Sequence, residues 1–384
     1  MSVAPHTTGP TDPAGPADRA RPRSLTAVEL EHLAVGARVL AVGTEESAYR
    51  VALDWAAAEL AAHGPVPLLP PDQLDGVGLC VAVTLAGASA ALAEQLPAGD
   101  EPVKAVRAVE RLVGRPAEAV VALNTAAENA LIALATAARC GLPLVDGDGC
   151  GRVLPLLEQT VFTLAGAAPA PLALSTPGGD VVTVESAGSR VEDLVRPLVL
   201  AAGGWSVVAG YPMDGAELAR CLVPSTVSRA IAAGAATGPE RFAPWRPRRL
   251  CRGRIAAVEQ STDADEEGFG PSHPWADAVA LPSRPTSVLV AENEGLRRRF
   301  RLEAHNEVLF ALADGAVAAA APDQILILSA TDKGVVDVER AVPGTEVEVV
   351  VIEAAPAWHT PRGRALARLG GPGPAGLGAG AVAW

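Results

Sequence analysis

One unit of strand, helix and strand between residues 119 and 149 limits the fold of this chain more than any other part of its sequence. An apolar run, AVVALN, is followed by an alanine-rich helical stretch ending at a glycine, and then by a second apolar run with its exit loop, LPLVDGDG. Strand, helix and strand at this spacing predict a right-handed parallel crossover. In such sheets, ligands bind outside the carboxyl ends of the strands. The sequence therefore predicts an α/β sheet with a binding edge that carries residues 124 and 146–149.

Length and residue pattern together predict two domains of unlike secondary structure. The chain has 384 residues, which is too many for one small core. We expect an α/β N-terminal domain with a partly parallel sheet over residues 24–166. Residues 167–370 are expected to form a C-terminal α+β domain that is rich in strands after residue 250, because apolar runs there alternate with turn residues. Pro- and Gly-rich ends predict a disordered tail over residues 1–23 and a flexible tail over residues 371–384.

Composition excludes several classes of partner. The net charge of −13 disfavours nucleic acid, because phosphate binding needs clustered cations. The sequence has no unbroken apolar run of about 18 residues and no signal-peptide core, so no membrane partner is expected. Five cysteines without paired spacing fit a reducing compartment. We therefore expect a cytoplasmic protein that acts on a small-molecule substrate.

Two aspartates at the end of the second apolar run are the first candidate site residues. Asp146 and Asp148 stand two residues apart, so they can converge on a divalent cation or act as acid and base. Each can instead hydrogen-bond its own turn. Arg152 follows on a glycine-bracketed turn, where it either holds a carbonyl or carboxylate of a substrate or forms a salt link between domains. Cys150 has no histidine nearby in sequence, which favours an apolar filler over a nucleophile.

Amide and hydroxyl side chains add a second set of candidates. Asn124 and Asn129 can hydrogen-bond a small polar ligand, although a first-turn capping role is favoured for Asn129. Ser225, Thr226 and Arg229 lie in the hydroxyl-rich start of a short helix, and a helix N-terminus can bind an anion. The favoured interpretation of this helix start is ordinary capping by Ser225.

Several stretches together resemble the S-methyl thiohydantoin desulfurase family, whose genes often adjoin hydantoinase and oxoprolinase genes. The resemblance runs from about Leu25 to Gly370. It implies an α/β N-terminal domain packed on a β-rich C-terminal domain. It also implies a hydrolytic reaction on a small five-membered cyclic ureide, thiohydantoin or lactam, with water replacing sulfur on the ring carbon, and it allows a divalent metal. The stretches that carry it are LPAGDEPVKAVRAVERLVGR, AARCGLPLVDGDGCGRVLP, FTLAGAAPAPLAL, GYPMDGAELARCLVPSTVSRAI, HNEVLFALADG, APDQILILSATDKG and TPRG.

The chain departs from the family pattern in two loops near the expected site. Where the resemblance implies a glycine run after the first helix, this chain has Thr44, Glu45 and Glu46. Loss of glycines that allow close backbone approach is expected to change or close a niche for a phosphate or carboxylate group. Where an acid is common after the arginine turn, the chain has Leu156, with Glu158 two residues further on.

A third departure lies in the loop after the first apolar run. The family pattern there is a glutamate and two glycines before an asparagine. This chain has Asn124 in place of the glutamate and Ala126 and Ala127 in place of the glycines, while Asn129 is retained. The matching positions are Asp146, Asp148, Gly149, Gly151 and Arg152.

Two functional hypotheses follow from this mixture. The first is a divergent enzyme of specialised metabolism that acts on a small cyclic amide, ureide or thioureide, or on a related carbonyl compound. Its expected residues are Asp146, Asp148, Arg152 and Glu158 for catalysis, Asn124, Asn129, Glu45, Glu46, Gly149, Ser225, Thr226 and Arg229 for substrate binding, and Asp146 and Asp148 for a divalent metal. The alternative is a non-catalytic homologue that binds a ligand or supports an active partner subunit. In either case we expect a homo-oligomer, or a hetero-oligomer with a homologue.

Overall fold

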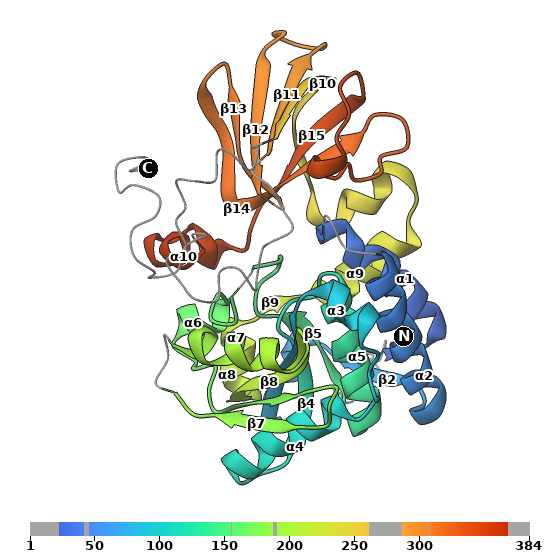
Figure 1. The fold of residues 1–384 in the computed structure, drawn as a ribbon, viewed down its shortest axis with the longest axis vertical. Coiled ribbons are helices and arrows are strands. Elements are labelled where there is room, and N and C mark those ends of the chain that lie inside the picture. The colour runs from blue at the N-terminus through green and yellow to red at the C-terminus, as the bar shows by residue number, and fades with distance from the viewer. Residues whose placement is uncertain are drawn as a thin grey trace, which may run out of the picture.

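An α/β unit and a closed β-barrel make up the computed structural model, which describes residues 23–41, 46–154, 156–186, 190–260, 286–305 and 307–367 (Figure 1). The α/β unit is built on a nine-stranded sheet. Its four central strands are parallel and its outer neighbours are antiparallel, which confirms the predicted partly parallel sheet. In spatial order the strands are β1 (Ser24–Leu25), β2 (Val66–Leu69), β5 (Leu144–Asp148), β4 (Ala117–Ala122), β3 (Leu79–Gly87), β8 (Trp205–Asp214), β6 (Leu172–Ser175) and β7 (Val181–Val184), with β9 (Val223–Pro224) pairing with β5.

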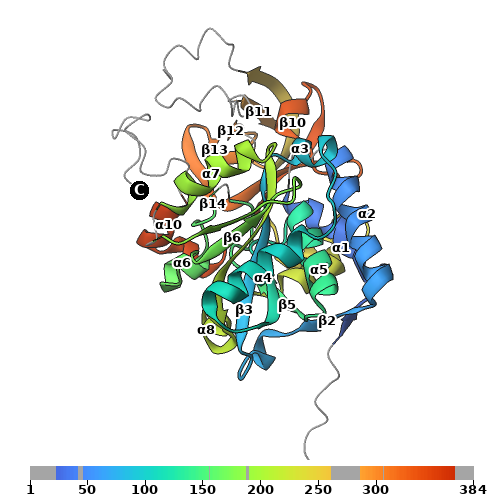
Figure 2. The ribbon, with the colours of Figure 1, turned by 60° about the horizontal axis from the view of Figure 1, so that its bottom comes forward.

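Helices cover both faces of this sheet (Figure 2). One face is packed by α1 (Ala27–Ala37), α2 (Glu46–His63), α3 (Ser89–Glu94), α4 (Glu101–Val113), α5 (Glu128–Cys140) and α9 (Thr226–Ala235). The other is packed by α6 (Val161–Ala165), α7 (Val191–Ala201) and α8 (Gly215–Cys221). Within the described ranges, none of the helices is both long enough and apolar enough to span a bilayer.

The predicted crossover is the β4–α5–β5 unit at the centre of the sheet. β4 pairs in parallel with β3 on one side and with β5 on the other. α5 ends at Gly141, whose left-handed backbone (φ 67°) lets its N–H return to the carbonyls of Ala137 and Ala138. Ten of the 13 residues of α5 are buried, because the helix lies between the sheet and neighbouring helices. The loops after β4 and β5 therefore leave the sheet at one common edge.

The sheet continues past residue 166, where a domain boundary was expected. β8 pairs with β3 from Leu79 opposite Asp214 to Gly87 opposite Trp205, and the β6–β7 hairpin adds to the far side of β8. These strands come late in the chain but extend the sheet that the earlier strands began. The α/β unit thus reaches through α9, and the second unit starts at residue 248.

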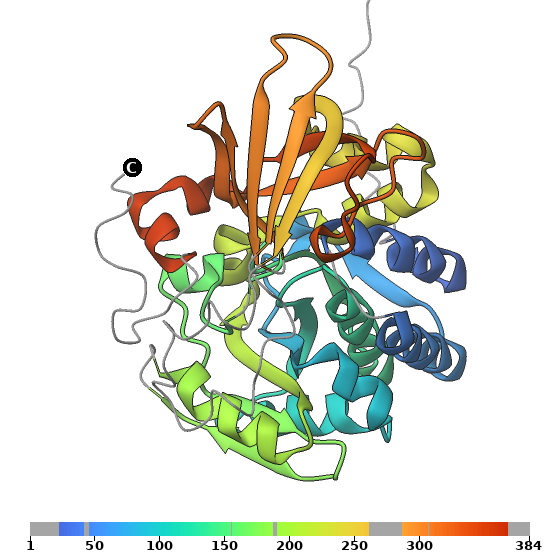
Figure 3. The ribbon, with the colours of Figure 1, turned by 45° about the horizontal axis from the view of Figure 1, so that its top comes forward.

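The second unit is an antiparallel barrel closed by pairing of its first and last strands. It confirms the prediction of a β-rich C-terminal region after residue 250. The barrel rests on the carboxyl edge of the sheet, where Leu326, Val350 and Ile352 pack against Leu40 and Ala126 of the α/β unit (Figure 3). Its strands are β10 (Arg248–Gln260), β11 (Thr286–Glu292), β12 (Arg299–His305), β13 (Glu307–Ala313), β14 (Ala316–Ser329) and β15 (Glu346–Ile352). After β15, η7 (Pro356–His359) and α10 (Pro361–Leu366) return to the α/β unit.

Helices α1 and α9 touch backbone to backbone through two glycines. A Cβ on Gly36 would overlap the carbonyl oxygen of Ala230, and a Cβ on Gly234 would overlap the carbonyl oxygen of His32. The contact is reciprocal, so each helix supplies one glycine and one carbonyl. This close packing fixes the axis of α9, whose first turn reaches the carboxyl edge of β5.

Replacing Gly36 or Gly234 by alanine is therefore expected to destabilise the protein by about 1–3 kcal/mol through overpacking. Without such a contact, replacing glycine by alanine in a helix interior stabilises a protein by about 1 kcal/mol. A loss of stability would therefore show that the two helices touch at these glycines. Urea unfolding followed by circular dichroism measures the change. Gly178→Ala is the control, since a Cβ there meets nothing closer than 3.6 Å. Unchanged stability of both helix variants would contradict the packing described.

Candidate functional site

The carboxylate of Asp148 joins the two loops that leave the carboxyl edge of the sheet. Its Oδ2 accepts the N–H of Thr125 at 2.8 Å, and its Oδ1 accepts the N–H groups of Cys150 at 2.9 Å and Gly151 at 2.6 Å. The side chain is only 1% exposed. Burial raises the pKa of Asp148, and the hydrogen bonds from the loops oppose that shift. Asp148 thus ties the loop after β4 to the loop after β5.

Asp146 holds the first turn of α9. Its Oδ1 accepts the N–H of Ser228 at 2.9 Å, its Oδ2 accepts the Ser228 hydroxyl at 2.6 Å, and its main-chain oxygen accepts the N–H of Ser225 at 2.8 Å. The expectation that Ser225 caps the helix was wrong. Ser225 has a left-handed backbone (φ 61°) and makes no side-chain capping bond, because the carboxylate of Asp146, 82 residues before Ser228, already fills that role.

Thr226 and Arg229 complete the contact between α9 and the strand ends. The hydroxyls of Thr226 and Thr125 lie 2.8 Å apart, so the helix also bonds the loop after β4. Arg229 donates to the carbonyls of Pro224 at 2.8 Å and Ser225 at 3.2 Å. Burial lowers the pKa of Arg229, and the nearby carboxylates of Asp148 and Asp146 oppose that change. The edge therefore combines two buried carboxylates with one arginine.

The two asparagines bond to each other and to the end of β3. Asn129 Oδ1 accepts the hydroxyl of Thr84 at 2.8 Å and the N–H of Leu85 at 2.7 Å. Asn129 Nδ2 donates to Asn124 Oδ1 at 3.4 Å, and the same oxygen accepts the N–H of Ala126 at 3.2 Å. Asn129 thus bonds a neighbouring strand instead of its own helix, contrary to the favoured capping interpretation. Asn124 is 5% exposed, and its Nδ2 makes no hydrogen bond to the described part of the chain.

Arg152 forms the domain-bridging link that was one of its two interpretations. Its Nη2 donates to Glu307 Oε1 at 2.7 Å, its Nη1 donates to the carbonyl of Pro322, and its Nε donates to the carbonyl of Val153 at 3.2 Å. Glu307 and Pro322 both belong to the barrel. The arginine is 4% exposed, so these partners offset the cost of burying its charge at the junction.

Gly149 packs against the ring of Phe162, and Cys150 accepts a hydrogen bond from the indole of Trp358. A Cβ on Gly149 would lie 2.7 Å from the ring of Phe162, so only glycine fits the turn without displacing that ring. The carbonyl of Cys150 accepts the indole N–H of Trp358 at 2.9 Å, and its thiol donates to the carbonyl of Gln159 at 3.3 Å. Burial raises the pKa of the Cys150 thiol well above its usual range, which agrees with the apolar-filler interpretation.

The predicted acidic side chains lie at separate places. Glu158 accepts the N–H of Glu192 at 2.8 Å, at the start of α7. Glu46, in the first turn of α2, is exposed and pairs with Arg38 at 2.7 Å, and that hydrogen bond lowers its pKa. Glu45 falls outside the described residues. The structure therefore brings together Asn124, Asn129, Asp146, Asp148, Thr226 and Arg229, while Glu158 and Glu46 contact other elements.

A divalent metal held by Asp146 and Asp148 does not fit the described residues. Both carboxylates are surrounded by N–H and O–H donors, which would point their hydrogens at a bound cation. Within the described ranges, no three His, Cys, Asp or Glu side chains are grouped so that they could hold one ion. The chemistry of this edge is that of hydrogen-bond donors and acceptors.

Sequence reasoning missed several residues that complete this arrangement. Thr125 follows Asn124 at a strand end, so the strand-end argument already pointed to its position. Thr84 lies inside β3, three residues before its end, so the strand-end argument did not point to it directly. Glu307 and Pro322 carry no such signal, because they reach Arg152 from 155 and 170 residues away in the chain.

Comparison with known proteins places the chain in a family. The S-Me-THD-like N-terminal domain matches residues 28–186, and the S-Me-THD-like C-terminal domain matches residues 186–381. The chain belongs to the S-Me-THD-like family, as its resemblance to the S-methyl thiohydantoin desulfurases predicted. A solved structure of a protein from Chromobacterium violaceum has a similar fold, with 23% identity, a TM-score of 0.62, and coverage of 87% of this chain and 92% of that chain. A search of curated proteins finds no match.

Asp148→Ala is expected to lower the free energy of unfolding by about 3 kcal/mol or more, because two buried N–H groups and one half-buried N–H group lose their acceptor. Asp148→Asn is expected to cost less, about 1–2 kcal/mol, because one amide oxygen still accepts while its NH₂ faces a donor. Urea unfolding measures both. Asp180→Ala, at an exposed turn, is the control and is expected to change stability by less than about 0.5 kcal/mol. Equal stability of the wild type and Asp148→Ala would show that Asp148 does not stabilise the two loops.

Ala127 has a backbone conformation suited to glycine. Its φ of 49° and ψ of −138° lie outside the regions open to L-residues. Ala127→Gly is therefore expected to stabilise the protein by about 0.5–2 kcal/mol, the relief of strain exceeding the entropy that glycine loses. Calorimetry would detect the rise in melting temperature. Ala58→Gly, on an exposed turn of α2, is the control and is expected to destabilise by about 1 kcal/mol.

Proposed function

We propose that this chain binds a small cyclic amide, ureide or thioureide at the Asn124–Asn129 turn and replaces a ring substituent by water. The observation that carries the proposal is the side-chain amide of Asn124 at the carboxyl edge of the sheet: the residue is 5% exposed, and its Nδ2 donates to no described residue. Such an amide N–H can donate to a ligand oxygen, sulfur or ring nitrogen. Membership of the S-Me-THD-like family supports the ligand class.

The surroundings of this turn suit a neutral polar ring better than a phosphate. The first turn of α9 directs its N–H groups at Asp146, which leaves fewer donors for an anion. The two carboxylates also oppose a second negative charge close to them. A cyclic ureide offers C=O groups as acceptors for the side-chain N–H groups of Asn124 and Asn129, whose Oδ1 atoms already accept hydrogen bonds within the chain.

The reaction we propose is a hydrolytic substitution. The oxygen of water bonds to the ring carbon, and the carbon–sulfur bond breaks. Sulfur leaves as a thiol with one proton of the water, and the ring nitrogen takes the other. The Asn124 amide would donate to the ring atom on which negative charge develops, which is the form of stabilisation that preorganised donors provide.

A second candidate function is a non-catalytic subunit that only binds such a ring. The observation that favours it is the saturation of Asp146 and Asp148 by hydrogen bonds within the chain, which leaves neither carboxylate free to activate water. Ala127 in a glycine conformation is also consistent with a site under relaxed selection.

Calorimetric titration with hydantoin, 2-thiohydantoin and an S-methyl thiohydantoin, together with a colorimetric assay for released methanethiol, separates these candidates. Asn124→Asp keeps the oxygen that accepts from Ala126 but removes the donor, so we expect it to weaken ring binding at least ten-fold. Asn293→Ala, in an exposed barrel loop, is the matched control and should bind as wild type does. Binding with thiol release supports the enzyme. Binding without release supports the second candidate, and absence of binding overturns both.

A further inference from the structure

The side chain of Gln324 has one end bonded and one end unpaired at the junction between the barrel and the α/β unit. Its Nε2 donates to the carbonyl of Leu40 at 2.7 Å, and the residue is only 4% exposed. Its Oε1 is buried and accepts no hydrogen bond from the described part of the chain. The carbonyl of Leu40 can only accept, which fixes the orientation of the amide. A buried acceptor without a donor is costly, so this oxygen is a place for a donor from outside the chain.

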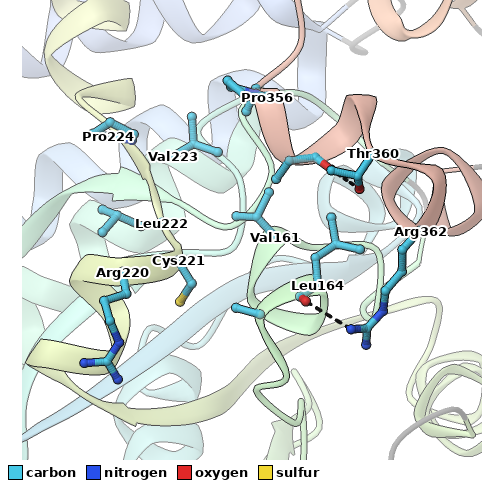
Figure 4. A pocket seen from close by; sticks show the side chains of 13 residues that line it. Val161, Leu164, Arg220, Cys221, Leu222, Val223, Pro224, Pro356, Thr360 and Arg362 are labelled. Carbon is cyan, nitrogen blue, oxygen red and sulfur yellow. Dashed lines mark hydrogen bonds between the residues drawn. The ribbon is translucent and has the colours of Figure 1, made fainter.

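The groove between α6, the α8–β9 segment and the returning η7–α10 segment has no such atom. It has a volume of about 360 Å³, and Val161, Leu164 and Pro356 are among the side chains that line it (Figure 4). The structure describes all of its lining residues, and none of them has a buried side-chain nitrogen or oxygen without a partner. The unmet hydrogen bond at Gln324 therefore points to the junction and not to this groove.

Gln324 faces the α/β unit because side chains alternate along β14. Ile325 belongs to the core of the barrel, whereas Leu326 packs with Leu40 and Ala126 at the junction. Gln324 lies on the same side of the strand as Leu326, and its bond to Leu40 agrees with that placement. Figure 1 shows β14 reaching the junction between the two units. The unpaired oxygen therefore belongs to the surface that the barrel turns toward the carboxyl edge of the sheet.

One short segment of the chain bonds both Gln324 and the turn after β4. The carbonyl of Ala37, at the end of α1, accepts the N–H of Ala127 at 3.1 Å. The carbonyl that accepts from Gln324 belongs to Leu40, three residues later at the end of a 3₁₀ turn. Three residues of 3₁₀ helix rise about 6 Å, so the two carbonyls are close. The amide of Asn124 belongs to the same turn as Ala127, which gives this region a donor from the sheet and an acceptor from the barrel.

We propose that Gln324 is a specificity-determining residue, whose Oε1 accepts the ring N–H of the ligand bound at the Asn124–Asn129 turn. This inference rests on the proposed function. A lactam or cyclic ureide has an N–H next to its C=O, so the ring can donate to Gln324 while its carbonyl accepts from Asn124. The oxygen is closed to solvent, so the ring reaches it by displacing apolar side chains of the junction. A ring without N–H leaves the acceptor unpaired and is rejected.

Calorimetric titration of the full chain with 2-imidazolidinone and ethylene carbonate tests this role. Both probes are five-membered rings with one carbonyl, and the two N–H groups of the first are ring oxygens in the second. We expect the wild type to bind 2-imidazolidinone about ten-fold or more tighter than ethylene carbonate. Gln324→Met keeps the length of the side chain and removes the acceptor, so the ratio of the two affinities is expected to fall to about one. The ratio is the readout, because the variant also removes the donor to Leu40.

Two further variants separate this role from a structural one and from the proposed function. Leu326→Met alters the same side of β14 without removing an acceptor, so it should keep the wild-type ratio. Asn124→Asp should weaken both probes by a similar factor and also keep the ratio, because both rings present a carbonyl. Equal affinity for the two probes in the wild type, an unchanged ratio in Gln324→Met, or binding of hydantoin but not of 2-imidazolidinone would overturn the role of Gln324 alone. Absence of binding by hydantoin and both probes would overturn the proposed function with it.

Discussion

A single buried carboxylate organises the carboxyl edge of the sheet. Asp148 is almost fully buried and accepts three main-chain N–H groups from two loops. An ionised side chain in this position requires donors, and the loops in turn require an acceptor for N–H groups that no strand satisfies. Because both needs are met by one residue, the loop after β4 and the loop after β5 have a common anchor. Asp146, two residues earlier, anchors α9 in the same way, because its carboxylate accepts hydrogen bonds from Ser228 in the first turn of that helix.

The same anchor reaches the barrel through Arg152. Gly151 donates to Asp148, and the next residue, Arg152, bonds Glu307 and Pro322 of the second unit. The barrel also covers the loop after β4 with the apolar cluster that contains Ala126 and Leu326. Trp358, on the segment returning from the barrel, bonds the carbonyl of Cys150 from a third direction. The candidate site is thus a product of the domain junction as much as of the sheet.

The turn after β4 combines a strained backbone with a side-chain amide. Ala127 has a conformation that glycine adopts without strain. Asn124 supplies an amide, not a carboxylate, at the carboxyl edge of the sheet. With Asp146 and Asp148 already bonded within the chain, the hydrogen-bonding capacity open to a ligand comes mainly from side-chain amides.

Local pattern was sufficient for much of the fold and for part of the site. The apolar runs around 119 and 144, with a helix of the right length between them, already required a parallel crossover. That crossover placed Asn124, Asp146 and Asp148 at one edge of the sheet, because parallel strands end on the same side. The alternating runs after residue 250 predicted the strands of the C-terminal region, because the periodicity of apolar residues is a local property of the chain.

Tertiary structure alone decided which groups bond to which. Ser225 was the local choice of cap for α9, but Asp146 takes that role by accepting from Ser228, 82 residues later in the chain. Asn129 accepts a hydrogen bond from Thr84 of β3, which lies 45 residues away in the chain. Arg152 pairs with Glu307, which lies 155 residues away. Strand β8 joins the first sheet by pairing with β3, and β6 and β7 follow through β8, although the sequence pattern changes near residue 166. Sequence spacing determines which residues share a strand end or a helix face, whereas hydrogen-bond partners depend on distances that arise only when remote segments pack.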